Sequence, residues 1–267
     1  EKGIEKAAQL GASGVQIYAT AGDFSPENMT KEKISEYKKI IKDNGLTVSA
    51  LCGDLGGHGF AIKEDNNWKV EKSKRIMDLA LEFETKAVTT HIGVIPSDSD
   101  CEKYKIMSEA CFELAKYGDD VGARFAIETG PEKCTTLKKF LDGLTSKGVG
   151  VNFDPANLIM VTDDDPVAGV RLLKDYIVHT HAKDGIMIKK TDPQIIYNFF
   201  AEGGIEDLRL EEYFKELPLG EGKVDFDNYL KALKEIGYNG FLTIERECGE
   251  YPEKDILLAV NFLKSKI

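Results

Sequence analysis

The chain has 267 residues, of which 42% are apolar and 30% charged, and this balance is typical of a globular protein with a sizeable buried core. Its 35 Lys and Arg residues against 46 Asp and Glu residues give a net charge of −11, which disfavours binding to a nucleic-acid backbone. No apolar run approaches the roughly 20 residues of a membrane span, and five cysteines without a CxxC pair or a secretory leader favour the cytoplasm.

Short apolar runs alternate with longer amphipathic stretches along almost the whole chain. Several short runs are apolar at nearly every position, as expected of parallel strands covered on both faces. A glycine ends several amphipathic stretches, which is a common helix stop before a strand. In chain order, the predicted elements are a helix over 4–10, a strand over 14–19, a helix over 31–44, a strand over 46–52, a helix over 70–83, a strand over 87–92, a helix over 102–121, a strand over 124–129, a helix over 134–145, a strand over 149–154, a helix over 166–173, a strand over 177–181, a helix over 226–236, a strand over 240–245 and a helix over 253–263.

The alternation of these elements indicates the fold class. Seven predicted strands and eight predicted helices, beginning with a helix, indicate a (β/α)₈ TIM barrel over residues 1–267 as a single domain, with the first strand missing from the N-terminus. An open doubly wound sheet is the alternative, but no glycine-rich phosphate loop follows an early strand. The connection over about 185–218 is unusually long, so we expect a lid or an interface there, the latter in a possible homodimer.

Ionisable side chains stand at the carboxyl ends of the predicted strands, the rim at which barrel enzymes work. A carboxylate buried in an apolar run is unfavourable unless it is paired or bound to a metal. Glu128, Asp154, His181 and Glu245 come from four successive strands, so one divalent cation would explain them together. Three carboxylates and one imidazole suit Mn²⁺ or Mg²⁺, with Co²⁺ or Zn²⁺ also possible.

Several motifs carry a resemblance to a known family: AIETGPE, VNFDPANL, HTHAKDG and the closing PLGEGKVDF…LKEIGYNGFLTIERE. With them the chain resembles the sugar-phosphate isomerase/epimerase superfamily, the xylose isomerase-like TIM barrels, over nearly its whole length. The resemblance to its ketose 3-epimerases implies that Glu128, Asp154, His181 and Glu245 hold one divalent metal, and that the two glutamates form a proton-transfer pair. His181 rather than His179 matches the ligand because it opens the His-x-Lys-Asp run.

Residues and resemblance together predict a divalent-metal-dependent sugar isomerase or epimerase with a small-molecule sugar as its partner. A metal on the carbonyl and adjacent hydroxyl of a keto-sugar would stabilise an enediolate, while Glu128 and Glu245 move the proton. No cluster of Arg and Lys demands a phosphate on the sugar, although Lys183 and Arg246 leave one possible. The candidate substrate-binding residues are His58, His91, Glu132, Lys183 and Arg246.

Three features depart from those epimerases and keep other functions open. Asn157 stands where the family often has a histidine, the GIMIKK stretch lacks an expected arginine, and the connection before Phe226 is longer. One alternative is an inosose-type dehydratase on the same scaffold, and another is a non-catalytic sugar-binding barrel. An endonuclease IV-like phosphodiesterase is disfavoured because it needs more than four histidines and a basic groove. Ion pairing or core packing of the same residues is the purely structural alternative.

Overall fold

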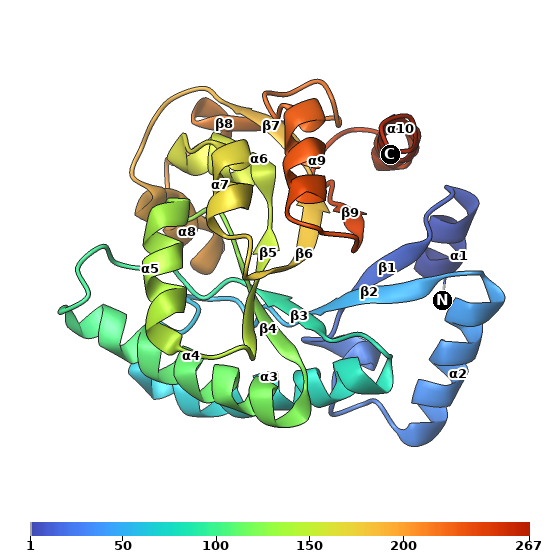
Figure 1. Cartoon of the computed structure of the whole chain (residues 1–267), viewed down its shortest axis with the longest axis horizontal. Helices are drawn as coiled ribbons and strands as arrows, with labels where there is room; N and C mark the ends of the chain where they lie inside the picture. The colour runs from blue at the N-terminus through green and yellow to red at the C-terminus, as the bar shows by residue number, and fades with distance from the viewer. Residues whose placement is uncertain (1) are drawn as a thin grey trace.

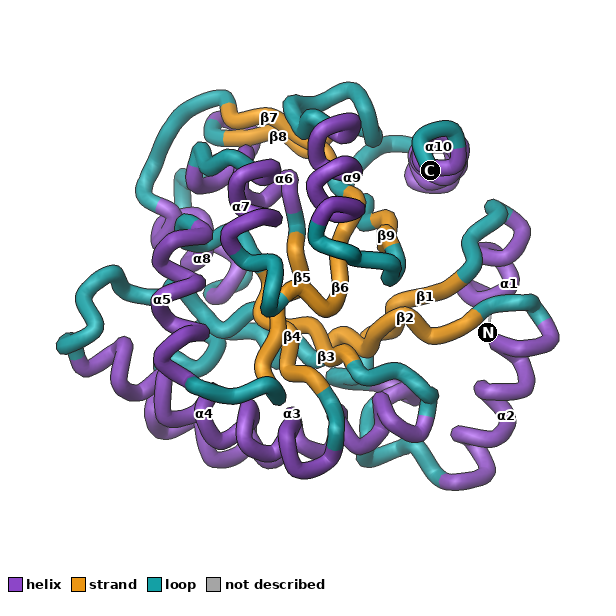
Figure 2. Tube along the Cα trace, in the orientation of Figure 1, coloured by secondary structure: helices purple, strands orange, loops and turns teal. Residues whose placement is uncertain are grey.

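Seven parallel strands form the central sheet of the molecule. A computed structural model describes residues 2–267 of the chain. The sheet has the strand order β1-β2-β3-β4-β5-β6-β9, and every neighbouring pair is parallel (Figures 1 and 2). The strands are β1 (Gly14–Tyr18), β2 (Thr47–Cys52), β3 (Ala87–Thr90), β4 (Arg124–Glu128), β5 (Val149–Phe153), β6 (Ile177–Ala182) and β9 (Leu242–Ile244).

Helices connect these strands and lie outside the sheet (Figure 1). Among residues 2–267, no helix combines the length and the apolar character that crossing a membrane requires. The longer helices are α1 (Lys2–Gln9), α2 (Lys31–Asp43), α3 (Lys63–Glu82), α4 (Glu102–Val121), α5 (Cys134–Leu144), α7 (Pro166–Leu172), α9 (Phe226–Glu235) and α10 (Pro252–Lys264). Short helical turns are η1 (Gly22–Phe24), α6 (Pro155–Asn157), the π-helical η2 (Leu158–Thr162) and η3 (Leu210–Glu212).

The TIM-barrel prediction is confirmed, and all seven predicted strands are present. The predicted helix over 70–83 is wrong at its start, because α3 begins seven residues earlier, at Lys63. Its first turns are polar, and even the indole of Trp68 is half exposed, so no apolar stripe marks these turns in the sequence. From Val70 onward, the helix buries apolar side chains against the sheet and α4.

The two end strands of the sheet, β1 and β9, lie near each other without a hydrogen-bonded ladder between them. Within residues 2–267 no strand fills this position, so the barrel has seven strands, in agreement with the prediction that one is missing. A cleft of about 1480 Å³ runs from the rim of the barrel into this opening, where β1, β9, α1, α9 and α10 line it. The cleft is therefore lined both at the carboxyl-end rim of the barrel and along the opening between β1 and β9.

The long connection that was predicted over 185–218 contains regular structure of its own. Strands β7 (Asp184–Met187) and β8 (Phe214–Leu217) pair antiparallel, and helix α8 (Pro193–Ala201) lies between them in the chain. The helix reaches the loop that follows β2, since the Tyr197 hydroxyl lies 3.4 Å from the Gly57 carbonyl oxygen. Ile196, Tyr197 and Phe200 line the cleft, so this connection forms part of its wall.

Alternation along the strands separates an apolar outer layer from a polar interior. In β4 and β5, Phe125, Val151 and Phe153 are fully buried among apolar side chains of the core. The side chains between them point to the opposite face, because successive residues of a strand alternate. Those opposite positions hold Asn152 in β5 and Glu128 at the end of β4. The interior of the barrel is thus polar near its carboxyl-end rim.

Candidate functional site

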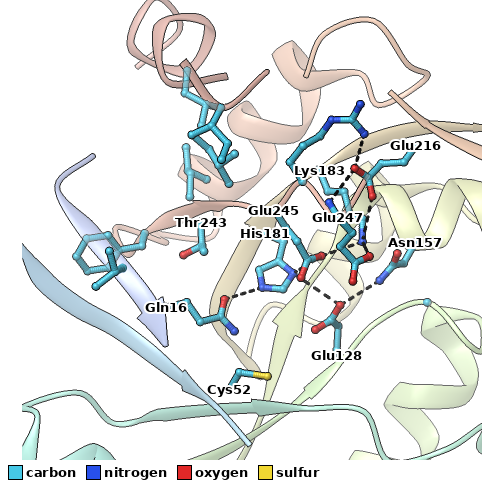
Figure 3. A pocket seen from close by; sticks show the side chains of 18 of the residues that line it. Gln16, Cys52, Glu128, Asn157, His181, Lys183, Glu216, Thr243, Glu245 and Glu247 are labelled. Carbon is cyan, nitrogen blue, oxygen red and sulfur yellow. Dashed lines mark hydrogen bonds and ion pairs between the residues drawn. The ribbon is translucent and has the colours of Figure 1, made fainter. Parts of the chain in front are cut away.

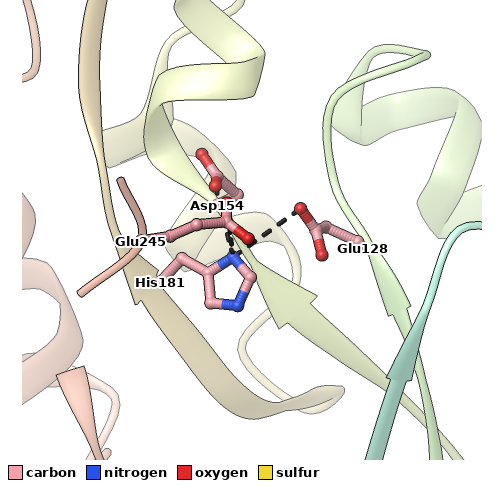
Figure 4. Close-up of side chains that lie close together, drawn as sticks. All are labelled: Glu128, Asp154, His181 and Glu245. Carbon is pink, nitrogen blue, oxygen red and sulfur yellow. Dashed lines mark hydrogen bonds and ion pairs between the residues drawn. The ribbon is translucent and has the colours of Figure 1, made fainter. Parts of the chain in front are cut away.

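Four ionisable side chains meet at the carboxyl ends of β4, β5, β6 and β9 (Figure 4). Glu128 is the last residue of β4, and Asp154 follows β5 directly. His181 lies near the end of β6, and Glu245 follows β9. One donor atom from each side chain lies within 4.8 Å of the donors of the other three, an arrangement that could hold a metal ion. The structure therefore brings together all four residues that were predicted as metal ligands.

The imidazole of His181 lies at the centre of this cluster. Its Nδ1 is 3.3 Å from Oδ2 of Asp154, 3.3 Å from Oε2 of Glu245 and 3.6 Å from Oε1 of Glu128. Burial by itself would lower the pKa of His181, but the surrounding carboxylates raise it well above its usual value. Burial also raises the pKa of the fully enclosed Asp154 carboxyl. The three carboxylates thus bring negative charges close together, and a bound cation would stabilise them.

The opposite nitrogen of the His181 ring is held by Gln16 of β1. Its Nε2 lies 2.9 Å from Gln16 Oε1, and the Gln16 amide nitrogen donates to Thr89 Oγ1 at 2.6 Å. A carbonyl oxygen can only accept, so Nε2 donates to Gln16 while Nδ1 faces the carboxylates. Gln16 was not predicted as a site residue, although a polar residue inside the apolar run GVQIYA was a signal that could have revealed it.

The chemistry of these donors fits a divalent cation. Three carboxylate oxygens and one imidazole nitrogen are hard or borderline ligands of the kind that Mn²⁺, Mg²⁺ and Zn²⁺ accept. The hydrogen bond to Gln16 directs His181 Nδ1 toward the three acids, where a bound cation would take the place of the Nδ1 proton. Asp154 is completely inaccessible and its only cationic neighbour within 4 Å is His181, so its charge lacks a permanent partner among residues 2–267.

Glu128 is fixed by two side-chain amides. Asn152 Nδ2 donates to its Oε2 at 2.9 Å, and Asn157 Nδ2 donates to its Oε1 at 3.0 Å. The Asn157 backbone N–H also donates to Asp154 Oδ1 at 2.8 Å, so this residue fixes two of the four cluster residues. Although burial opposes it, the neighbouring His91 and His181 hold the pKa of Glu128 below its ordinary value.

Glu245 has a cationic partner instead (Figure 3). Lys183 Nζ lies 2.9 Å from Glu245 Oε2 and 2.5 Å from Glu247 Oε2. Against the effect of burial, His181 and Lys183 together hold the pKa of Glu245 well below its ordinary value. Arg246 lines the same cleft, but its guanidinium donates to Glu216 at 2.5 Å and to Asp255 at 2.8 Å.

His91 lines the cleft directly after β3, on the side of the site nearest Glu128. Its Nδ1 is 3.0 Å from Asp54 Oδ2, and its Nε2 is 3.5 Å from Glu128 Oε1. Burial would lower the pKa of His91, but these acids raise it to about 10. The resulting imidazolium can hold Asp54 and Glu128 together while it presents a hydrogen-bond donor to the cleft.

Two of the predicted substrate-binding residues do not line the cleft. His58 turns toward Glu202 of the long connection, with its Nε2 3.8 Å from the carboxylate. Glu132 is buried beneath the loop after β3, where its Oε2 accepts a hydrogen bond from the Ile95 N–H at 3.2 Å. Burial raises the pKa of Glu132 to about 8. The other three predicted substrate residues, His91, Lys183 and Arg246, do line it.

A second layer of polar side chains lies below the cluster. His179 Nδ1 bonds to Asn152 Oδ1 at 2.8 Å, and His179 Nε2 lies 2.9 Å from Thr243 Oγ1. Burial lowers the pKa of His179 to about 3, so this imidazole stays neutral. Because Asn152 also donates to Glu128, this layer supports the floor of the site from within the barrel.

Comparison with known proteins gives matches along nearly the whole chain. Residues 4–266 match the family model described as xylose isomerase-like TIM barrel. A xylose isomerase domain protein from Planctomyces limnophilus is 27% identical, with a TM-score of 0.79, over 98% of this chain and 90% of that chain. The probable 3-DHS dehydratase AsbF from Bacillus anthracis is 17% identical, with a TM-score of 0.73, over 98% of this chain and 92% of that chain, so it shares the fold. The D-psicose 3-epimerase from Clostridium cellulolyticum H10 is 16% identical, with a TM-score of 0.69, over 99% of this chain and 92% of that chain, and it also shares the fold.

A curated relative matches only in part. An uncharacterized protein of Methanocaldococcus jannaschii is 25% identical over 191 residues, which are 67% of this chain and 56% of that protein. The aligned part therefore spans little more than half the length of that relative.

Proposed function

The chain belongs to the xylose isomerase-like TIM-barrel family, and from this premise we propose that it is a divalent-metal-dependent sugar isomerase or epimerase. The single observation that carries the proposal is the convergence of Glu128, Asp154, His181 and Glu245 on one point of the rim. A bound divalent cation would supply positive charge beside the carbonyl and neighbouring hydroxyl oxygens of a keto-sugar, which acidifies the adjacent C–H. Mn²⁺ and Mg²⁺ suit this donor set best.

In this proposal the two glutamates move the proton. Glu128 and Glu245 approach the same point from different strands, so one can take a proton from one face of a carbon and the other can return it to the opposite face. Asn152 and Asn157 fix the Glu128 carboxylate, which keeps its oxygens aimed at the cleft. The His91 imidazolium stands beside Glu128 and is positioned to bind a substrate hydroxyl.

Loss of water from the sugar is the second candidate reaction. Lys183 Nζ lies 2.9 Å from Glu245, so an ammonium group stands beside one of the two carboxylates, where it can hydrogen-bond a departing hydroxyl. The two candidates share proton abstraction and differ in the next step. Return of the proton gives an isomer or epimer, whereas expulsion of the neighbouring hydroxyl gives a product that is lighter by one molecule of water.

The first experiment measures the metal content of the purified protein and of the Asp154→Asn/His181→Ala double variant. We expect about one Mn, Mg, Co or Zn per chain in the wild type and a loss of that metal in the double variant. The second experiment incubates the loaded protein with ketoses in deuterated water and follows carbon-bound deuterium and mass. A wild type that binds no divalent metal, and gains no thermal stability from added Mn²⁺, would overturn the proposal.

A further inference from the structure

The rim of the cleft contains two permanently cationic side chains, and both are already bound by acids. Lys183 is 4% exposed, and its Nζ lies 2.9 Å from Glu245 Oε2, 2.5 Å from Glu247 Oε2 and 3.8 Å from Glu216 Oε2. Figure 3 shows this ammonium group among the three carboxylates. An anionic group of a substrate that approached Lys183 would have to compete with all three acids at short range.

The guanidinium group of Arg246 is likewise already bound by carboxylates. Its guanidinium is 9% exposed and donates to Glu216 through Nη1 and to Asp255 through Nε. If a phosphate took these donors, the Glu216 carboxylate, whose side chain is only 5% exposed, would lose its close guanidinium partner and keep only the Lys183 ammonium group at 3.8 Å. Breaking a buried ion pair in this way leaves an uncompensated charge inside the protein, which is strongly unfavourable.

The glycine-rich loop after β2 does not offer an anion site either. A loop of this composition can bind phosphate through its backbone N–H groups. Here the carboxylate of Asp54 occupies that position, because its Oδ1 accepts the Gly56 N–H at 2.8 Å while its Oδ2 faces His91 at 3.0 Å. Asp54 also lines the cleft, so the loop presents negative charge to a ligand.

The balance of charge at the rim is negative. Five carboxylates line it, and Asp154 lies within the cluster below them, whereas the permanent cations at this end are Lys183 and Arg246. A bound divalent cation would leave this end of the cleft with excess negative charge. The lysines that line the rest of the cleft belong to the outer helices α1, α9 and α10 or to the residues after α10. The five carboxylates are Asp54, Glu128, Glu216, Glu245 and Glu247.

We propose that the substrate is an uncharged polyhydroxy ketone, and that sugar phosphates and carboxylate-bearing cyclic ketones are excluded from the site. This inference rests on the proposed function and specifies its substrate. Hydroxyl groups can donate to the surrounding carboxylates and leave the ion pairs of His91 and Lys183 in place, whereas an anionic group meets repulsion from Asp54 and Glu247.

The test compares matched substrates with the Mn²⁺-loaded protein in deuterated water. The pairs are D-tagatose with D-tagatose 6-phosphate and D-fructose with D-fructose 6-phosphate, and 2-keto-myo-inositol is compared with 3-dehydroshikimate. We expect exchange or turnover with an uncharged compound, and a kcat/KM at least about 100-fold lower for its charged counterpart. Faster reaction of the charged compounds would overturn the inference while leaving the proposed function intact.

If no compound reacts, the proposed function fails, and a titration of the Mn²⁺-loaded protein with inorganic phosphate then decides the inference. Binding with a Kd below about 1 mM that is lost in the Lys183→Ala variant would overturn it. No binding up to about 10 mM would support it, because a site built for an anion retains some affinity for phosphate.

Reversing the charge of a single acid tests whether the acidic rim of the cleft causes the preference for uncharged compounds. Glu247 lines the cleft with a side chain that is 60% exposed, and Glu250 is an exposed acid nearby that does not line it. Glu247→Lys should reduce the preference for the uncharged compound, or strengthen phosphate binding, by at least about tenfold. Glu250→Lys makes the same change in net charge and should leave both quantities unchanged. Equal effects of the two variants, or none from Glu247→Lys, would refute the role of the acidic rim.

Discussion

Gln16 allows a direct test of whether His181 must be held in place for the cluster to bind a cation. Its amide joins His181 Nε2 at 2.9 Å to Thr89 Oγ1 at 2.6 Å, and Gln16→Leu removes both bonds with little change in volume. Outer hydrogen-bond partners of metal-binding histidines typically contribute about 10–100-fold to affinity. We therefore expect the Kd for Mn²⁺ to rise about 10–100-fold, which corresponds to about 1.4–2.8 kcal/mol.

Calorimetric titration of the metal-free protein with Mn²⁺ near neutral pH measures this change. Thr243→Val is the matched control, because it removes a hydrogen bond to His179 in the layer below, and the Thr243 side chain has no hydrogen bond to any of the four cluster residues. Thermal unfolding without metal shows whether either variant is loosely folded. An unchanged Kd in Gln16→Leu, or an equal rise in Thr243→Val, would refute the reasoning that Gln16 orients the ligand.

Three further substitutions separate the roles of buried acids. Asp154→Asn should weaken Mn²⁺ binding at least about 100-fold, because it removes a charged ligand, and calorimetric titration measures this change. The metal-free protein should not be destabilised, because the variant removes one of several crowded negative charges, and thermal unfolding tests this point. Glu132 keeps its proton in the folded state up to a pKa of about 8, whereas the unfolded chain loses it near 4.5, so stability falls as pH rises through this interval. Glu132→Gln should remove this pH-dependent loss of stability, which is at most about 5 kcal/mol. If the free energy of unfolding of the variant differs from that of the wild type by the same amount at pH 6 and at pH 9, the prediction is contradicted. Asp184 accepts the backbone N–H groups of Gly220 and Gly222, so Asp184→Asn should lower the free energy of unfolding by about 2–4 kcal/mol in a denaturant titration, and a change under about 0.5 kcal/mol would argue against it.

The cluster could be predicted from the sequence because its geometry follows from regular structure. Each of its residues ends or follows an apolar strand, and the carboxyl ends of parallel strands meet at one rim. The two-residue repeat also places His179 below His181 on the same inner face. Position along a strand therefore determined both the depth and the direction of these side chains.

Residues in loops were harder to place, because no repeat fixes where they point. Glu132 is four residues after Glu128 in the chain, yet it turns under the loop that contains Ile95. His58 lies in a glycine-rich loop and faces Glu202 on the long connection, a contact between segments that the sequence does not relate. Tyr197 reaches the cleft from that connection for the same reason, and nothing in its local pattern indicates it.

The surroundings of the two glutamates give the proposed reaction a preferred direction. Glu128 is held by the neutral amides of Asn152 and Asn157 with His91 farther away at 3.5 Å, whereas Glu245 contacts the ammonium group of Lys183 at 2.9 Å. An adjacent cation makes a carboxylate a weaker base than neutral donors do, and the pKa of Glu245 is accordingly the more strongly lowered of the two. We therefore expect the C–H that faces Glu128 to exchange faster, so that two epimers of one ketose take up deuterium at different initial rates. Lys183→Met should narrow that difference by making Glu245 more basic, and equal initial rates in the wild type would show that the two carboxylates are equivalent despite their neighbours.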